Sequence, residues 1–571
     1  MRRAGVLSIE AGASRVAAFA RRRWPPLLLL LAWMLSALLI WPLGEFSIVD
    51  DWAFTLPVKW LVEDGVLQFT HWPAMTLVTQ VVAGALWSEV FGFSQLNLRL
   101  LVVAFAGAAL VFAYLIARAC GLSKPTALVV AALPLASPIF AAMSTSFMTD
   151  TPYLAMTLAT TYALIRVLAD GPRWPRWFAA GALLLAASIF LRQTGVAMAL
   201  AFVVADVCAN GLRARTLLRS AALVAFAAGL VPLASSMMVD LTGGAKAYSG
   251  VLGGIGVFVG DLLRFESRPV WYFAATAFWG AIYVGMFAAP LGVGVLAHRI
   301  AAGRISLASE GAIAALAAVL LVALRLTGRG FPRGHVLLEH GISPRLIWPY
   351  DEFASGDGFS WPLAALSALG LAFLIVEASK GAAAALGGVR IRAERLRLGR
   401  VLLVAAVAML TYLPYCVYYA SWYDRYMLVT AAAGAISVAA FRPQADREFA
   451  AAAPLVALCV AVGALWSAAL ARDYFVWHRA REALVERAMS QYGLSADEID
   501  GGQERNNYQA FIASARESAP TRLIDASNRA YQLSKTEKTG YEVLEIVDPP
   551  QIFPSPHARI ILLRKTELPA E

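Results

Sequence analysis

Apolar runs long enough to cross a bilayer recur along most of this 571-residue chain. Lipid offers no hydrogen-bond partner to backbone groups, so each run must satisfy its own backbone as a helix. Only 15% of the residues are charged, whereas soluble domains carry roughly 25%. The sequence therefore predicts an all-α polytopic membrane protein.

About thirteen transmembrane helices are expected. The first apolar stretch follows three arginines at 21–23, and no small-residue cleavage site comes after it, so we interpret it as an uncleaved span rather than a signal peptide. At 191–194 two spans are separated by almost nothing, which predicts a tight hairpin or a re-entrant turn. The predicted spans are residues 25–43, 97–117, 125–143, 152–168, 177–191, 194–209, 219–238, 270–297, 307–325, 360–377, 401–419, 427–441 and 450–471.

The distribution of Lys and Arg predicts how these spans are oriented. Most of them gather at alternate ends of the apolar runs, as positive residues do on the cytoplasmic side of a membrane. We therefore expect residues 1–24 to lie in the cytoplasm and the chain to reside in the inner membrane of a cell. These anchors also explain the net charge of +10, and no basic segment with interleaved aromatics indicates a nucleic-acid partner.

In this orientation the long loop 44–96 faces outward. Within it, residues 53–65 and 73–91 have apolar residues at helical spacing that are interrupted by polar positions, which is typical of helices lying along the membrane interface. The alternative is that 73–91 crosses the membrane, but this would invert every later span and break the charge bias.

The composition changes from apolar to charged after residue 471. We therefore divide the chain into a transmembrane domain, 25–471, and a small extracytoplasmic α/β domain, 472–571. Period-3.6 and period-2 patterns predict the elements of the second domain, namely helices at 473–491 and 507–518 and strands at 541–547 and 558–565.

Carboxylates gather in the loops that are expected to face outward. Asp50 and Asp51 follow the first span directly; they could accept a proton, bind a sugar hydroxyl or help to hold Mg or Mn. The simpler interpretation is a solvated pair of loop acids. Asp150 lies in the segment SFMTDTPYLA, where a residue that caps the next helix is the simpler interpretation. The remaining acids of these loops that we single out are Asp351, Glu352 and Asp424.

Cationic and aromatic residues in the same loops could bind a phosphate or a sugar. Arg192, in FLRQTG, could form a bidentate ion pair with a phosphate, or could be an anchor whose side chain reaches to the membrane surface. Asp424 and Arg425 stand beside Tyr423, which suits a sugar or lipid-phosphate contact as well as an interfacial aromatic belt. His71 is a further candidate, although a lone histidine is more often a polar loop residue.

Taken in order, these motifs resemble GT-C glycosyltransferases of the protein-mannosyltransferase and aminoarabinose-transferase type, which are similar to glycosyltransferase family 39. An acidic pair followed by an amphipathic segment that ends in glycine is matched by Asp50, Asp51 and Gly65. The family's element of Thr, Asp, any residue and Pro is matched at 149–152, and its late acid-Arg-Tyr element at 424–426. The chain departs from the family at 192–195, where RQTG stands in place of a common Lys-Gly.

The resemblance implies a GT-C-like fold and a sugar donor linked to polyprenyl phosphate. Asp50 would orient or deprotonate the acceptor hydroxyl, while Asp51 and Asp150 would support it or help to hold a divalent ion. Arg192 and Arg425 would stabilise the leaving phosphate, and a single displacement would invert the anomeric centre. The acceptor could be a glycolipid, a glycan or a protein.

Three other functions remain open on the sequence alone. A lipid-linked glycan polymerase or ligase also works outside the membrane, but usually carries its large active loop late in the chain. A transporter or flippase should have ionisable residues near the middle of its spans, whereas Asp206 and Glu377 fall near predicted cytoplasmic ends. The third alternative is a non-catalytic scaffold with sugar-binding loops.

Overall fold

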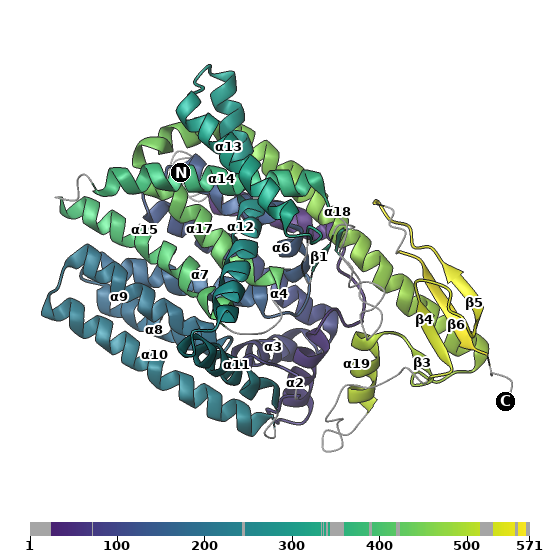
Figure 1. Cartoon of the computed structure of the whole chain (residues 1–571). Helices are drawn as coiled ribbons and strands as arrows, with labels where there is room; N and C mark the ends of the chain where they lie inside the picture. Colours follow the sequence, from purple (N-terminus) through teal and green to yellow (C-terminus); the bar gives the residue numbers. More distant parts are fainter. Residues whose placement is uncertain are drawn as a thin grey trace, which may run out of the picture.

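The computed structural model describes residues 24–70, 72–242, 246–332, 334, 336–338, 341–342, 359–386, 391–417, 423–513, 529–553 and 558–566. A bundle of long helices makes up most of the molecule, and a small sheet stands at the far end of the long helix α18 (Figure 1). This arrangement agrees with the predicted order of a helical region followed by a smaller mixed one.

By position in the chain, the helices of the described residues divide into a first half, up to residue 263, and a second half, from residue 267. The first half contains an initial helix Trp24–Ile40, α2 (Asp51–Glu63), α3 (Val78–Phe91), α4 (Gln95–Ala119), α5 (Lys124–Ala132), α6 (Pro138–Met143), α7 (Asp150–Leu168), α8 (Trp174–Ile189), α9 (Ala197–Asn210), α10 (Ala214–Leu241) and α11 (Lys246–Leu263). The second half contains α12 (Ser267–Ala301), α13 (Leu307–Leu326), α14 (Trp361–Leu386), α15 (Arg392–Leu410), α16 (Leu413–Val417), α17 (Met427–Phe441), α18 (Asp446–Tyr492) and α19 (Gln503–Ala513).

Eight helices in the described part of the chain are long and apolar enough to cross a membrane, which confirms a multi-span helical membrane protein. The number thirteen stays a prediction. These eight are Gln95–Ala119, Gln193–Asn210, Ala214–Leu241, Ser267–Ala301, Leu307–Leu326, Trp361–Gly381, Arg392–Val417 and Asp446–Tyr492.

One predicted span is broken into pieces. Residues 125–143 form α5, the short 3-10 helix η1 (Leu133–Ala136) and α6. Pro134 and Pro138 lie at these breaks, and proline cannot donate the backbone hydrogen bond that would continue an α-helix. The expected tight turn at 191–194 is present as a second 3-10 helix, η2 (Gln193–Val196), between α8 and α9.

Both helices expected in the first outward loop are present, but they are covered differently. Most of α2 is buried within the protein, where it packs against α3 and α19. By contrast, α3 exposes Val82, Leu86 and Val90, which are spaced four residues apart and share one face. The exposed apolar face of α3 suits contact with lipid, whereas α2 is held by protein.

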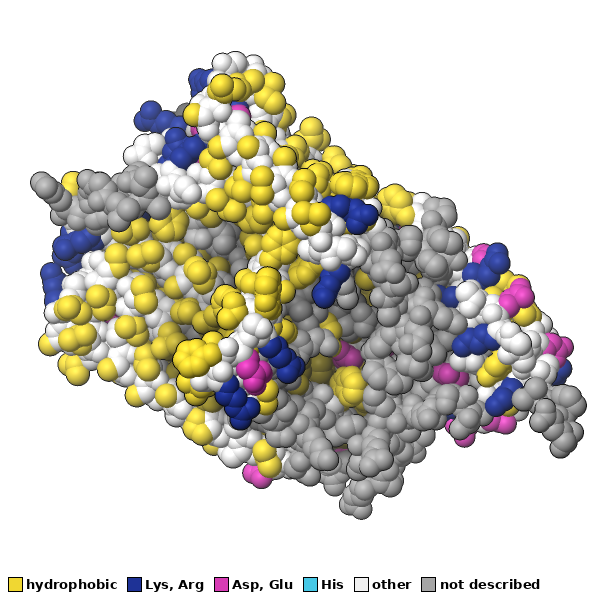
Figure 2. Space-filling view, in the orientation of Figure 1, with side chains coloured by type: hydrophobic (Ala, Val, Ile, Leu, Met, Phe, Trp, Pro, Cys, Tyr) yellow, Lys and Arg dark blue, Asp and Glu magenta, His cyan; other side chains and the backbone are white. Residues whose placement is uncertain are grey.

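Buried ion pairs fasten α12, α13, α14 and α18 together. Arg299 of α12 pairs with Glu310, with Glu377 at 3.0 Å and with Glu448 at 2.8 Å. Figure 2 shows Lys and Arg side chains gathered at the end of the bundle around α13, while hydrophobic side chains cover much of its flank. A largely hydrophobic flank of this kind suits contact with lipid.

The predicted domain boundary at residue 471 falls inside α18, which continues without a break from Asp446 to Tyr492. Trp477, Leu484 and Val485 on the later part of α18 form a separate small core with the sheet.

The sheet has the order β3-β4-β6-β5. Its strands β4 and β5 each pair antiparallel with β6, whereas β3 runs parallel to β4. The two predicted strands are present as β5 and β6, while β3 and β4 were not predicted. The bounds are β3 (Ile499–Asp500), β4 (Tyr531–Ser534), β5 (Tyr541–Val547) and β6 (Ile560–Lys565), and a separate pair is formed by β1 (Leu337–Leu338) and β2 (Gly341–Ile342).

Candidate active site

Asp50 stands at the start of α2, where it is the N-cap residue. Its Oδ1 accepts a hydrogen bond from the indole Nε1 of Trp72 at 3.1 Å, and its Oδ2 lies 3.5 Å from Nη2 of Arg425. The side chain is 22% exposed, so it is held by two neighbours and is still reachable from outside. A held and accessible carboxylate can accept a proton from a bound hydroxyl.

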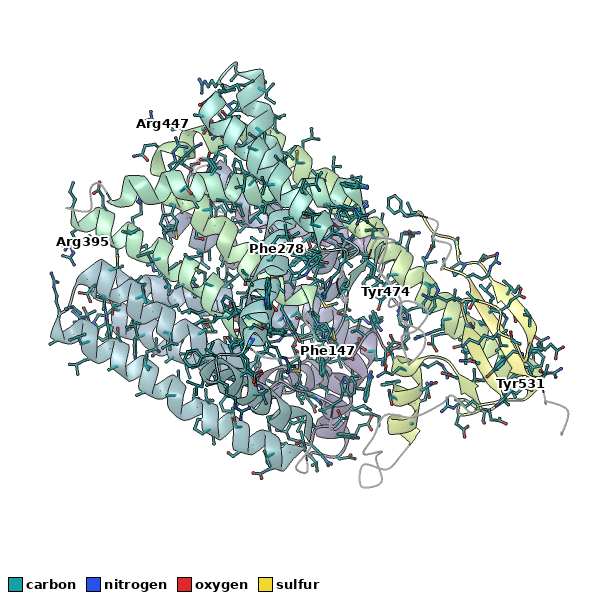
Figure 3. All side chains as sticks on the ribbon, viewed as in Figure 1. Phe147, Phe278, Arg395, Arg447, Tyr474 and Tyr531 are labelled. Carbon is teal, nitrogen blue, oxygen red and sulfur yellow. The ribbon has the colours of Figure 1, made fainter. Side chains whose placement is uncertain are left out.

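The adjacent acid, Asp51, has a different environment. It is 2% exposed, and its Oδ1 accepts the backbone N–H of Ile48 at 2.7 Å. Burial raises the pKa of Asp51 to about 7, although the charge of Arg99 and hydrogen bonds from the backbone at Ile48 and Phe147 oppose this rise. Phe147 is labelled in Figure 3 within the interior of the molecule. The two neighbouring acids therefore do not act as one solvated pair.

Asp150 is the first residue of α7 and is 2% exposed. Its Oδ1 accepts a hydrogen bond from Nη2 of Arg192 at 2.8 Å. Arg192 also donates from Nε to the hydroxyl of Thr149 at 2.9 Å. The N-cap position belongs to Thr149, and no side-chain hydrogen bond caps this helix, so the interpretation of Asp150 as a simple capping residue is wrong.

Arg425 lies between the two carboxylates of this cluster. Its Nη2 is 3.5 Å from Asp50 Oδ2, and its Nε is 3.9 Å from Asp150 Oδ2. The guanidinium is buried, and within the described residues its Nε and Nη1, like Asp150 Oδ2, make no hydrogen bond. Buried donors of this kind are costly unless a partner reaches them, so they mark a place where an anionic group would be stabilised.

Aromatic rings surround the two arginines. Tyr415 stacks on Tyr426 with 4.1 Å between ring centroids and 16° between planes. The guanidinium carbon of Arg425 lies 4.9 Å from the ring centroid of the half-buried Tyr423, and that of Arg192 lies 5.5 Å from Tyr426. These contacts hold the cations in place by cation–π attraction. No sequence pattern pointed to Tyr415, because it lies in an ordinary apolar stretch.

The geometry of Asp424 favours a different role from the one expected. Its carboxylate is fully buried and accepts the backbone N–H groups of Leu337 at 2.9 Å and of Val336 at 3.1 Å. A carboxylate occupied by backbone amides is poorly placed to bind a sugar. We therefore propose that Asp424 anchors the segment at β1 rather than binding a sugar.

Three residues that the sequence singled out are outside the described residues: His71, Asp351 and Glu352. For them the expectation stays a prediction.

The three carboxylates that the sequence suggested for a divalent ion do not form one ligand set. Asp51 is engaged by the Ile48 amide, and Asp150 is paired with Arg192. The described part of the chain contains no group of three or more His, Cys, Asp or Glu side chains that could hold a metal. Two arginines beside Asp50 and Asp150 would also repel a cation, so we derive no step that depends on a metal.

These observations define a multi-span helical membrane protein with a buried acid–arginine cluster at the N-terminal ends of α2, α7 and α17. A comparison with known families agrees with the sequence motifs: residues 82–238 match the family described as dolichyl-phosphate-mannose-protein mannosyltransferase. The resemblance to GT-C glycosyltransferases of the protein-mannosyltransferase type is thus confirmed over that region. No curated protein matches the chain.

Several solved structures are similar at low sequence identity. ArnT from Cupriavidus metallidurans, bound to undecaprenyl phosphate, is 13% identical, with 95% of this chain and 98% of that one covered and a TM-score of 0.39. The archaeal oligosaccharyltransferase AglB from Archaeoglobus fulgidus, in complex with an inhibitory peptide and a dolichol-phosphate, is 14% identical, with coverages of 89% and 61% and a TM-score of 0.44.

The protein O-mannosyltransferase Pmt1-Pmt2 complex of S. cerevisiae, bound to its sugar donor, is also similar, with 13% identity and a TM-score of 0.30. The match covers 38% of this chain and 33% of that one. The chain thus spans about a third of the length of the yeast protein that it matches.

Proposed function

We propose that this protein is an inverting glycosyltransferase that moves a sugar from a polyprenyl-phosphate donor to an acceptor on the extracytoplasmic face of the inner membrane. The single observation that carries the proposal is the position of Arg425 between Asp50 and Asp150, with two buried guanidinium nitrogens that make no hydrogen bond within the described residues. The motif order and the family match over residues 82–238 support the same class of reaction.

Asp50 is the proposed base. Its side chain is 22% exposed, whereas Asp51 and Asp150 are each only 2% exposed, and Trp72 and Arg425 fix its orientation. In the reaction, the acceptor hydroxyl would lose its proton to Asp50 as its oxygen forms a bond to the anomeric carbon. The bond from that carbon to the phosphate oxygen breaks at the same time, so the configuration inverts and the polyprenyl phosphate leaves with the electron pair.

Arg425 is the proposed phosphate ligand. Charge develops on the leaving phosphate in the transition state, and a fixed guanidinium in a poorly solvated site stabilises such charge well. Arg192 is already engaged by Asp150 and Thr149, so its part is to hold Asp150 against Arg425 rather than to bind the phosphate alone. This refines the role that the RQTG segment was expected to play.

An apolar cavity could receive the polyprenyl chain. Its volume is about 760 Å³, which is within the range of sites for small organic ligands, and none of the described residues that line it is charged. α12, α14 and α18 form its walls through residues such as Met286, Leu366 and Val462. Leu337 also lines it, and the amide of Leu337 binds Asp424, the neighbour of Arg425 in sequence. The cavity and the proposed phosphate site are therefore linked by one short segment.

The transporter alternative is less well supported by the buried acids. Asp206 pairs with Arg219 between α9 and α10, and Glu377 pairs with Arg299 and, at 3.0 Å, with Arg442. Acids that are fully neutralised by fixed arginines suit helix packing better than a path that must bind and release a solute.

A transfer assay tests the proposal. The purified protein would be incubated with labelled polyprenyl-phosphate sugars and a membrane extract that supplies glycolipid, glycan and protein acceptors. We expect transfer by the wild type and a loss of at least about a thousandfold in Asp50→Asn, because a base is removed and the leaving step stays intact.

Asp64→Asn is the matched control, since Asp64 is an exposed acid at the other end of α2. It should keep wild-type transfer. Full activity in Asp50→Asn would show that Asp50 is not the base. Movement of a lipid-linked sugar across liposomes, with no transfer from any donor, would favour the flippase alternative.

A further inference from the structure

The turn that presents Asp50 has a strained backbone. Val49 has φ of +57°, in the left-handed region that a β-branched residue rarely adopts. A conformation of this kind costs free energy and persists only where neighbouring contacts enforce it. The residue that follows Val49 is Asp50, so the direction of the Asp50 side chain depends on whatever holds this turn.

Asp51 closes the turn with both its backbone and its side chain. Its backbone N–H donates to the carbonyl oxygen of Ile48 at 3.1 Å, and its Oδ1 accepts the N–H of Ile48 at 2.7 Å. The two bonds tie the residue before Val49 to the residue after Asp50. Removing the side-chain acceptor would leave a buried Ile48 N–H without a partner, and the strained turn would be free to relax.

The segment before the turn is fixed by Arg99 from α4. The guanidinium is fully buried and donates to the carbonyl oxygens of Gly44, at 2.6 Å, and of Phe46. The Phe46 ring lies 4.6 Å from the guanidinium carbon and stacks on His478 of α18 at 5.3 Å. The segment 44–48 is thus clamped between α4 and α18, and Asp51 joins the turn to that clamp.

We propose that Asp51 is a positioning residue, whose carboxylate holds the turn 48–51 so that Asp50 faces Arg425. This inference rests on the proposed function for the role of Asp50 and assigns to Asp51 a part other than proton transfer or metal binding. The groups that face Asp51 are Asp50 on its own helix, Arg99 of α4, Tyr474 of α18 and Tyr508 of α19. Within this set Arg99 is the cation that balances the charge of Asp51.

The two substitutions Asp51→Asn and Asp51→Ala separate positioning from catalysis. Asparagine keeps an acceptor oxygen for the Ile48 amide, whereas alanine removes it. We expect Asp51→Asn to retain kcat within about threefold and Asp51→Ala to lower kcat about tenfold or more, with KM for the lipid donor changed by less than about twofold. If Asp51→Asn is as inactive as Asp50→Asn, Asp51 acts in the chemistry and the proposal is overturned.

Hydrogen exchange measured by mass spectrometry gives a second readout that does not depend on transfer. Peptides that cover residues 46–55 should exchange faster in Asp51→Ala than in the wild type and should be protected again in Asp51→Asn. The control Asp64→Asn should leave them unchanged. Unaltered protection in Asp51→Ala would show that Asp51 does not hold the turn, even if activity is lost.

The two readouts also separate this inference from the proposed function. A wild-type protein that transfers no sugar, combined with deprotection in Asp51→Ala and rescue in Asp51→Asn, would leave the positioning role of Asp51 standing and reject the glycosyltransferase. If the wild type transfers sugar but Asp51→Asn does not restore the protection lost in Asp51→Ala, the glycosyltransferase would stand and the positioning role of Asp51 would be rejected.

Discussion

Arg425 is the residue whose replacement should distinguish a phosphate ligand from a structural cation. Arg425→Lys keeps the charge but loses the planar fork and the Nη1 donor that has no partner among the described residues. We expect this variant to bind a polyprenyl phosphate at least about tenfold more weakly, measured by titration calorimetry in detergent. Arg447→Gln, an exposed substitution at a distant site, is the control. Unchanged affinity in Arg425→Lys would contradict the assignment.

Asp150 should matter to stability as well as to activity. Asp150→Asn leaves Arg192 and Arg425 buried beside each other without their shared acid, and breaking a buried pair in this way costs about 3 kcal/mol. The midpoint of thermal unfolding should therefore fall. In the double variant with Arg192→Gln part of that loss should be recovered, because one uncompensated charge has been removed. A double variant that is less stable than the sum of the single ones would argue against this coupling.

The raised pKa of Asp51 predicts how the stability of the folded protein depends on pH. Burial raises its pKa from 3.8 to about 7, so between these values the folded protein keeps a proton that the unfolded chain releases. The unfolding free energy should therefore fall as the pH rises from about 4 to about 7, and should level off above that. Denaturation in detergent at several pH values would measure this. Asp51→Asn should flatten the slope, and an identical slope in that variant would assign it to another group.

The divergence of Asp50 and Asp51 shows what adjacency in sequence could not predict. The motif placed both acids in the loop after the first span, but their environments come mostly from side chains that are far away in the chain. Trp72 and Arg425 reach Asp50, while Arg99 and the Ile48 amide surround Asp51. Only the fold brings these groups together, so the positions of the acids were predictable and their roles were not.

At the scale of elements, apolar periodicity predicted the long helices well because burial in lipid requires a helix. It missed details that depend on single residues, such as the division of 125–143 at Pro134 and Pro138. It also missed β4, which has only four residues and depends on its pairing with β6. Short strands carry too little periodic signal to be recognised without their neighbours.

The short β1–β2 pair should depend on Asp424. Asp424→Ala removes the acceptor for the amides of Val336 and Leu337, so we expect faster hydrogen exchange in peptides that cover 331–338. Transfer should fall by about tenfold or less, because the change reaches the reaction only through the neighbouring Arg425 and the cavity wall at Leu337. A complete loss of transfer with unchanged exchange would instead place Asp424 in contact with substrate.

At the scale of the whole molecule, α18 contacts the segment that follows the first helix. Arg479 of α18 donates to the carbonyl oxygens of Trp41, at 2.9 Å, and of Leu43 at the end of the first helix. Phe475 and His478 pack on Phe46 one turn away. The loop that carries Asp50 is thus held by α4 from within the bundle and by α18 on the side of the C-terminal sheet. We therefore expect the sheet and the proposed active site to lie on the same side of the membrane.

This shared side gives a test of orientation that is independent of catalysis. The four native cysteines would first be replaced by alanine, so that only the new cysteines can be labelled. Cys120 and Cys416 are buried, and Cys208 and Cys459 are partly buried. New cysteines would then be introduced at two exposed positions, Lys565→Cys on β6 and Arg395→Cys at the start of α15. Figure 3 labels Arg395 at the far end of the bundle from the sheet.

In intact cells a maleimide that cannot cross membranes should label Lys565→Cys, and Arg395→Cys should be labelled only after the cells are lysed. This outcome follows from the concentration of Lys and Arg at the Arg395 end, which the positive-inside rule places in the cytoplasm. The reverse pattern would put Asp50 and Arg425 on the cytoplasmic face. A lipid-linked donor would then have no advantage over a soluble one, and the proposed extracytoplasmic reaction would be excluded while the geometry of the acid–arginine cluster remained.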